Sequence, residues 1–265
     1  GGRWGAEHLV EHHPEYNGDA VISGEPSSSG MVCFGEYGNL WLDVSVEGRS
    51  AHSALPQGVN AIEALVDLLD DIRGLRREDY DMPDDVLAVV DDVPPTPAGA
   101  DPVLEDGRSE QFRKPSINFG TIEGGEKINL CSASAGAEVD LRLPIGTSVP
   151  DVLDRIEGFA ADSAASIEVE PVQWTPSYHS DVSHPIFDLV RESGALVRDE
   201  SPALSYAYTL SDCRFYRAKG IPSLWYGPTS YNMGTADEYI LVDEFIDVAA
   251  VQTLAAARYL DVVDG

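Results

Sequence analysis

The chain has 265 residues, with 46 Asp and Glu against 17 Lys and Arg, so its formal net charge is -29. Such a charge repels nucleic acid phosphates and anionic lipid headgroups, and we expect neither nucleic acid nor a membrane surface as a partner. No apolar run approaches the roughly 18 residues that a membrane-spanning helix needs. The length allows one or two domains, and we expect two.

The basic residues are mostly arginine, with lysine only at positions 114, 127 and 219. This acidic, lysine-poor composition resembles that of proteins from salt-loving archaea, in which salt screens the self-repulsion of the folded chain. Cys33, Cys131 and Cys213 lie far apart and form no C-x-x-C pair. They indicate neither a disulfide framework nor a thiolate zinc site, and a reducing cytoplasm fits.

Residues 5–13 read as a short helix that ends at Pro14, and residues 19–23 as a strand. A second unit begins near Glu36 and has the order β-α-β-β-α-β, the ferredoxin-like arrangement. Its predicted elements are a strand at 39–47, a helix at 58–73, strands at 116–123 and 128–143, a helix at 149–163 and a strand at 166–174. Residues 78–114, rich in Asp and Pro, read as a partly disordered excursion from this unit.

From about residue 176 helices alternate with apolar strands, which favours an α/β layer. The predicted elements are helices at 184–197 and 211–219, a strand at 221–226 and a helix at 242–260. We therefore expect residues 1–35 and 176–265 to form one discontinuous α/β domain. Residues 36–175 would be a ferredoxin-like α+β domain inserted into it.

His52 lies in the loop GRSAHSALPQGVNA, which connects a strand pattern to a helix pattern. Pro56 and Gly58 restrict the loop, and an imidazole held between two rigid elements is well placed to meet a ligand. The loop alone is equally compatible with a turn histidine that makes one backbone hydrogen bond.

The segment His8-Leu9-Val10-Glu11-His12 matches H-x-x-E-H, the pattern of inverted zinc proteases. The helix ends immediately afterwards and its surroundings are polar. We therefore favour an ordinary solvated surface helix.

Several short signals have both a functional and a structural interpretation. Glu25 follows an apolar strand, where α/β sheets place their ligands, although a loop carboxylate often only accepts a hydrogen bond. Arg142 lies on the polar face of a strand and could form a simple surface ion pair. Ser211 and Asp212 open a helix and could cap it, while Arg214 could bind a carboxylate.

The order of the motifs is more specific than any one of them. GDAVISGEPS, the His52 loop, INFGTIEGGEKIN, EVDLRLP, SDCRFYRAKGIP and YGP with DEY follow one another from Gly1 to about Leu260. This series resembles the zinc-dependent amidohydrolase and exopeptidase family of acetylornithine deacetylase, succinyl-diaminopimelate desuccinylase, aminoacylase and carboxypeptidase G.

The resemblance implies a zinc-exopeptidase-like catalytic domain with two zinc ions and an inserted lid that forms a homodimer. Glu25 would be a zinc ligand, and His52 would stabilise the oxyanion in a neighbouring subunit's site. Asn129, Arg142 and Arg214 would hold the substrate, and Gly227 would lie in a loop that lines the pocket. The substrate would be an N-acyl amino acid or a small peptide, and cobalt or manganese would suit the same ligands.

Two departures from the family pattern affect this interpretation. The family's H-x-D motif and its acidic pair, which includes the general base, have no counterpart here, so we expect an N-terminally truncated chain that is inactive by itself. Gly234 also stands where the family usually has a metal-binding histidine. A non-catalytic relative that keeps the fold for binding and dimerisation is therefore the alternative hypothesis.

Overall fold

The computed structural model describes residues 3–90, 99–100 and 111–261. It divides into two compact units. Unit 1 comprises Gly1–Tyr37, Met82–Gln111 and Ser177–Gly265, and unit 2 comprises Gly38–Asp81 and Phe112–Pro176.

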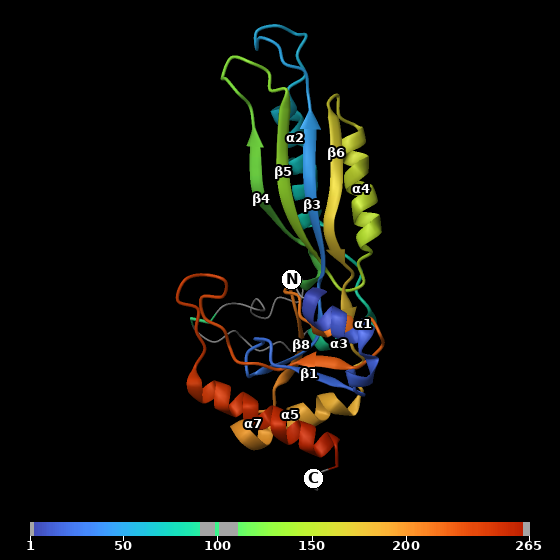
Figure 1. Cartoon of the computed structure of the whole chain (residues 1–265), viewed down its shortest axis with the longest axis vertical. Coiled ribbons are helices and arrows are strands. Elements are labelled where there is room, and N and C mark those ends of the chain that lie inside the picture. Colours follow the sequence, from blue (N-terminus) through green and yellow to red (C-terminus); the bar gives the residue numbers. More distant parts are fainter. Residues whose placement is uncertain (1–2, 91–98, 101–110, 262–265) are drawn as a thin grey trace. The chain divides into compact units, whose positions relative to one another are not determined.

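Unit 2 has the β-α-β-β-α-β order that the sequence predicts. Its elements are β3 (Gly38–Glu47), α2 (Ala61–Gly74), β4 (Ser116–Gly124), β5 (Ser134–Leu143), α4 (Val149–Ala161) and β6 (Ser166–Thr175). The sheet has the order β4-β5-β3-β6 with all neighbours antiparallel, and α2 and α4 cover one of its faces (Figure 1). This is the ferredoxin-like arrangement.

Strict alternation along β3 builds the core of unit 2. Leu40, Leu42, Val44 and Val46 are buried, whereas the residues between them are exposed. The buried stripe of α2 packs in the same core, with members spaced three or four residues apart. The side chain of Asn60 caps α2 by accepting a hydrogen bond from the Ile62 amide.

Unit 1 contains a mixed five-stranded sheet. Its strands are β1 (Val21–Ser23), β2 (Met31–Glu36), β7 (Tyr178–His179), β8 (Ala203–Ala207) and β9 (Ser223–Trp225). The pairs β1–β9 and β2–β8 are parallel, while β2 runs antiparallel to β7 and β9. The long helices α5 (Pro185–Arg198) and α7 (Val242–Tyr259) pack against each other beside the sheet (Figure 1).

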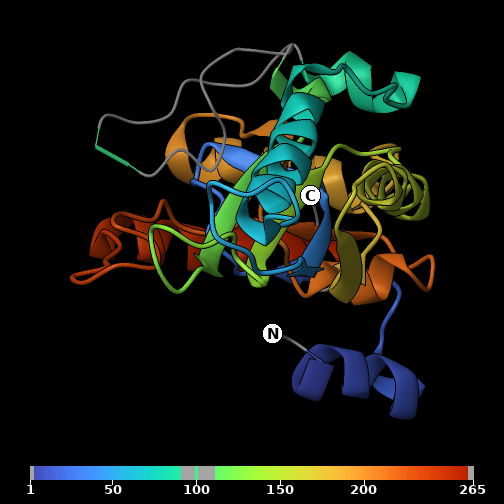
Figure 2. The same ribbon diagram turned by 90° about the horizontal axis from the view of Figure 1, so that it is seen from above.

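Shorter helices complete unit 1. They are η1 (Arg3–Glu7), α1 (His8–His12), η2 (Pro14–Tyr16), α3 (Asp84–Val90) and α6 (Cys213–Arg217). η1 and α1 form one helical segment near the N-terminus, dark blue in Figure 2. The helix predicted at 211–219 is therefore shorter in the structure, since α6 spans only its central residues.

Three other predictions differ from the structure. The strands β2 and β8 were not predicted, and the strand predicted at 128–143 begins only at Ser134. The segment 78–114, predicted as a partly disordered excursion of the insert, contains α3, which groups with unit 1 and not with the insert. The reason is packing: α3 lies against β8, Val86 is fully buried, and the Tyr206 hydroxyl donates to Met82 Sδ. Residues 91–98 and 101–110 of this segment lie outside the described residues, so the predicted disorder is not tested.

Among the described residues, no helix is long and apolar enough to cross a bilayer.

Candidate active site

Glu25 and Gly227 are neighbours because the strands that precede them are paired. Val21–Ser23 of β1 runs parallel to Ser223–Trp225 of β9, so the segments that follow these two strands leave the sheet side by side. A Cβ added at Gly227 would lie 2.0 Å from the carbonyl oxygen of Glu25. Ser27 Oγ also accepts a hydrogen bond from the Gly227 amide at 2.9 Å. A glycine at 227 is thus required by the close approach of the Glu25 backbone.

The Glu25 carboxyl has an unusual electrostatic environment. Burial raises its pKa, and the nearby carboxylate of Asp212 raises it further. A hydrogen bond from the Asp212 backbone and the positive charge of Arg214 act in the opposite direction, but the net pKa remains raised. Glu25, Asp212 and Arg214 therefore lie close enough to influence one another, and a bound cation would favour the ionised form of Glu25.

Arg214 is buried and is held by residues at the start of α6 and by Phe215 within it. Its Nη1 donates to the Ser211 carbonyl at 2.5 Å and lies 3.9 Å from Asp212 Oδ1. Its guanidinium also lies over the ring of Phe215, 4.1 Å from the ring centroid. These contacts fix the orientation of the guanidinium beside Glu25.

A second carboxylate, Glu36, supports this arrangement from the end of β2. Arg217 Nη1 donates to Glu36 Oε1 at 2.8 Å, and the Ser211 amide donates to Glu36 Oε2. Arg217 also donates to the Ser223 carbonyl of β9 at 2.9 Å. The pair therefore ties β2, β9 and the start of α6 together. Burial raises the pKa of Glu36, while Arg217 opposes that shift.

Glu244, in the first turn of α7, joins the two loops that flank Glu25 and Gly227. Its Oε1 accepts hydrogen bonds from the Ser29 amide at 3.1 Å and the Thr229 hydroxyl at 2.7 Å. Between Glu25 and Ser29, Ser28 has a φ of 82°, a left-handed value that is uncommon for a non-glycine residue. The Glu244 contacts help to hold this strained loop in place.

The described residues do not assemble a metal site. No three His, Cys, Asp or Glu side chains among them converge on a common point. Glu36 is occupied by Arg217, so Asp212 is the only other carboxylate near Glu25 among the described residues of this cluster, and a third ligand is missing. Gly234, where the family usually has a histidine, lies in an exposed loop and its amide donates to Glu238 Oε2 at 3.2 Å. The residues present therefore do not fit a two-zinc centre by themselves.

His52 and Asn129 lie together at one end of the unit 2 sheet. His52 forms a β-bridge with Leu130, and the Ser53 amide donates to the Asn129 carbonyl at 3.0 Å. The His52 ring is exposed and its Nδ1 accepts a hydrogen bond from the Ala54 amide at 3.2 Å. That bond is the one expected of a simple turn histidine, but it leaves Nε2 exposed and able to contact a ligand.

Arg142 lies at the other end of the same sheet. It pairs with Asn39 on β3, whereas Ser134, at the start of β5, pairs with Glu47 near the His52 loop. The stretch of β5 between Ser134 and Arg142 spans roughly 27 Å at about 3.4 Å per residue. Arg142 forms an ion pair with Asp140 at 2.9 Å. The structure therefore does not bring His52 and Arg142 together within one protomer.

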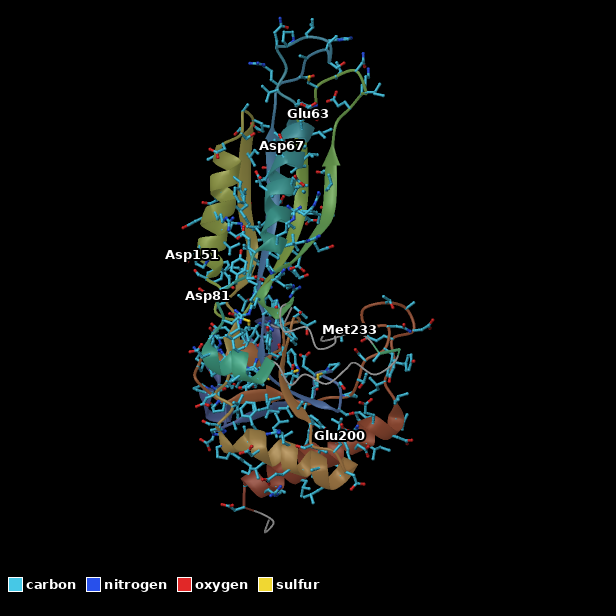
Figure 3. All side chains as sticks on the ribbon, turned by 180° about the vertical axis from the view of Figure 1, so that it is seen from behind. Glu63, Asp67, Asp81, Asp151, Glu200 and Met233 are labelled. Carbon is cyan, nitrogen blue, oxygen red and sulfur yellow. The ribbon has the colours of Figure 1, made fainter. Side chains whose placement is uncertain are left out.

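Unit 2 also has a cavity of about 420 Å³ between α2 and the region where α4 leads into β6. Its rim is acidic and includes Glu63 and Asp67, one turn apart on α2 (Figure 3). Leu68, Phe159 and Ile167 are among its apolar lining residues. None of the candidate catalytic, substrate-binding or metal-binding residues lines this cavity, although Gly58 of the His52 loop does.

Sequence reasoning missed Glu36, Arg217 and Glu244. Glu36 and Arg217 are 181 positions apart, so no local pattern links them. A glutamate at the end of an apolar run was the available signal for Glu36, but the strand that carries it was not predicted.

The fold defines the class of protein: a discontinuous α/β unit with a ferredoxin-like insert, carrying a buried carboxylate and arginine cluster at its strand ends. The chain belongs to the M20 peptidase family, since the family model described as a peptidase dimerisation domain matches residues 34–168. That match includes β3, α2, β4, β5 and α4 of unit 2 and ends at residue 168, near the start of β6.

Curated relatives include deacetylases and peptidases. An acetylornithine deacetylase from Vibrio vulnificus is 27% identical over 251 residues, covering 92% of this chain and 58% of that protein. A succinyl-diaminopimelate desuccinylase from Caulobacter vibrioides is 26% identical over 250 residues, covering 91% and 57%. A probable carboxypeptidase from Ajellomyces dermatitidis is 32% identical over 173 residues, covering 64% and 33%. The chain thus spans between about a third and three fifths of the length of these relatives.

Solved structures agree on the fold. An M20 family metallo-carboxypeptidase from Sulfolobus solfataricus aligns with a TM-score of 0.73 at 13% identity, over 94% of this chain and 65% of the other. A tripeptidase from Staphylococcus aureus aligns with a TM-score of 0.70 at 16% identity, over 98% and 62%. The predicted family and fold class are confirmed.

Proposed function

We propose that the full-length protein hydrolyses an amide bond in an N-acyl amino acid or a small peptide, with the help of divalent metal ions. The observation that carries this proposal is Glu25: a half-buried carboxylate with a raised pKa, held beside Arg214 in a chain of the M20 family. The names of the relatives, which include a deacetylase, a desuccinylase and a carboxypeptidase, support amide hydrolysis in general.

In this proposal Glu25 is one ligand of a zinc centre, with cobalt or manganese as substitutes. Its carboxylate suits such ions, but the described residues supply no complete site. We therefore assign the remaining ligands and the general base to parts of the protein outside this chain, and we expect the chain alone to be inactive. Its free cysteines suit a reducing cytoplasm.

A homodimer through unit 2 is the second element of the proposal. β4 and β6 are the sheet edges. On β4, Ile122 is 63% exposed, and Ile62 and Val66 of α2 are 39% and 57% exposed. β6 also exposes Val172 and Trp174, but it carries Pro171, which cannot donate to a further strand. The β4 edge and α2 are thus the better surface for a second copy. Sedimentation in molar salt should show a dimer, and Ile122→Arg should convert it to monomer.

The dimer gives separate roles to the residues of unit 2. His52 and Asn129, which lie together at one end of the sheet, would serve the partner's site, where His52 stabilises an oxyanion. Arg142 lies at the other end of the sheet, roughly 27 Å from Ser134 along β5, which argues against a shared site within one protomer. Arg142 and Arg214 would contact the substrate carboxylate, and Gly227 would shape the pocket beside Glu25.

The alternative is a non-catalytic relative that binds and dimerises. Gly234 favours it, because a glycine with a φ of 71° in an exposed loop offers no side chain to a metal. One experiment separates the two proposals: the full-length protein is assayed with N-acyl amino acids and dipeptides in the presence of zinc, cobalt or manganese. Metal-stimulated hydrolysis of any member supports the enzyme, and its absence across the panel and all three metals supports the binding role.

A further inference from the structure

Two histidines near the N-terminus face each other on one side of a helix. His8 and His12 are four residues apart in α1, and their rings stack with centroids 4.4 Å apart and planes 24° apart. Both residues are exposed. The four-residue spacing places both imidazoles on the same helical face, where rotation about their side-chain torsions can bring one nitrogen of each ring to a single ion.

The hydrogen bonding of His12 leaves a nitrogen ready to bind a metal. Its Nδ1 lies 3.1 Å from the carbonyl oxygen of His8. A carbonyl oxygen only accepts, so Nδ1 must carry the proton, and Nε2 keeps its lone pair whenever the ring is neutral. A backbone carbonyl that fixes the tautomer in this way is the usual support for a metal-binding histidine.

The helix that carries the pair is anchored to its surroundings. Val10, on the opposite side of α1 from the ring pair, is buried, and Asn17 Nδ2 donates to the Val10 carbonyl at 3.3 Å. The His13 amide donates to the Leu9 carbonyl and closes the last turn. These contacts hold the backbone that carries the two imidazoles, which reduces the backbone freedom that would be lost on binding an ion.

We propose that His8 and His12 form a two-imidazole site for a divalent first-row transition metal ion such as Ni²⁺ or Cu²⁺. Within the described residues no third His, Cys, Asp or Glu joins the pair, so water would complete the coordination. The site differs from the inverted zinc protease pattern, because Glu11 has no part in it. It is independent of the proposed function.

The experiment is calorimetric titration of the untagged 265-residue chain with Ni²⁺. Excess Mg²⁺ occupies the many surface carboxylates, which prefer hard ions, and Ni²⁺ avoids redox chemistry at the partly exposed Cys131 thiol. We expect His8→Gln and His12→Gln each to weaken Ni²⁺ binding at least about tenfold, since even the loss of a ligand's supporting hydrogen bond typically costs 10–100-fold.

Two matched variants test the assignment. His13→Gln removes the adjacent histidine, and Glu11→Gln removes the carboxylate of the protease pattern; both should bind Ni²⁺ like the wild type. Circular dichroism verifies that each variant is folded. Unchanged binding in the His8→Gln/His12→Gln double variant, or an equal loss in His13→Gln or Glu11→Gln, would overturn the proposal. Amide hydrolysis is not measured, so neither result bears on the proposed enzymatic function.

Discussion

Glu36 and Arg217 form a fully buried ion pair, with Oε1 and Nη1 2.8 Å apart and side chains 0% and 1% exposed. Arg217 also donates to the Ser223 carbonyl, and Glu36 accepts from the Ser211 amide. The pair thus connects the end of β2 with β9 and with the loop that leads to Arg214. Both charged side chains are removed from bulk solvent, so each charge depends on the other.

Replacing one partner should therefore be costly. We expect Glu36→Gln to lower the free energy of unfolding by about 3–5 kcal/mol, because Arg217 would keep a buried charge without its counter-ion. Urea unfolding in molar salt measures the change. The matched control is Glu78→Gln, which breaks the exposed ion pair between Glu78 and Arg155 and should cost less than about 1 kcal/mol. Equal losses in the two variants would contradict the prediction.

Alanine substitutions at Gly227 and Gly158 should change stability in opposite directions. Gly227→Ala should lower the free energy of unfolding by about 1–3 kcal/mol, because the new Cβ would lie 2.0 Å from the Glu25 carbonyl oxygen and the backbone must move. Gly158→Ala, in α4 with nothing near its Cβ position, should instead raise it by up to about 1 kcal/mol. Thermal unfolding of both variants checks the opposite signs; two changes of the same sign would refute the steric argument.

The sequence predicted those helices and strands that have one buried and one exposed side. β3 alternates between buried and exposed residues, and its predicted range, 39–47, differs from Gly38–Glu47 by one residue. All six residues of β2 are buried, so the strand has no period of two to detect. The strand predicted at 128–143 was too long because the bridge between His52 and Leu130 is isolated and the continuous ladder starts only at Ser134.

The candidate site was predictable only where its residues belong to short motifs. Glu25, Arg214 and Gly227 lie in such motifs, and the structure brings them into one unit. The role of Glu244 could not be predicted from the sequence, since its contacts with Ser29 and Thr229 depend on how α7 packs against two loops. Contacts between segments far apart in the sequence produce no recognisable spacing of residues along the chain.

Glu244 should make stability depend on pH. Burial alone would raise its pKa, but the hydrogen bonds from Ser29 and Thr229 outweigh this and lower it below the usual 4.5. A lowered folded pKa means that the stabilisation is complete above 4.5 and is lost as the pH falls through the folded value. Glu244→Gln should therefore be less stable than the wild type near pH 7, and the difference should shrink as the pH falls below 4.5. Urea unfolding across this range tests it; a constant difference would contradict it.

Repulsion between carboxylates on the acidic face of the unit 2 sheet should make the folded protein more stable in high salt than in low salt. Asp43 lies directly opposite Glu138 on β5 and Glu170 on β6. Asp43→Asn should raise stability in low salt by about 0.2–1 kcal/mol per relieved contact, and the gain should fade near 1 M salt, where the Debye length is about 3 Å. Asp70→Asn, which removes the partner of Arg73 at 2.9 Å, should show no such gain. A gain for Asp43→Asn that persists in 1 M salt would rule out charge repulsion as its cause.

The proposed role of His52 across the dimer predicts complementation between inactive subunits. Glu25→Gln and His52→Ala full-length proteins should each be inactive, but a mixed dimer keeps one site with both Glu25 and the partner's His52 intact. Random mixing by co-expression should then restore about a quarter of wild-type activity, because half the dimers are mixed and each has one working site. The control mixes Glu25→Gln with Arg214→Ala: both residues lie in unit 1, so every site lacks one of them and no activity should return. If the Glu25→Gln and His52→Ala mixture also remains inactive although mixed dimers form, His52 does not act in the partner's site.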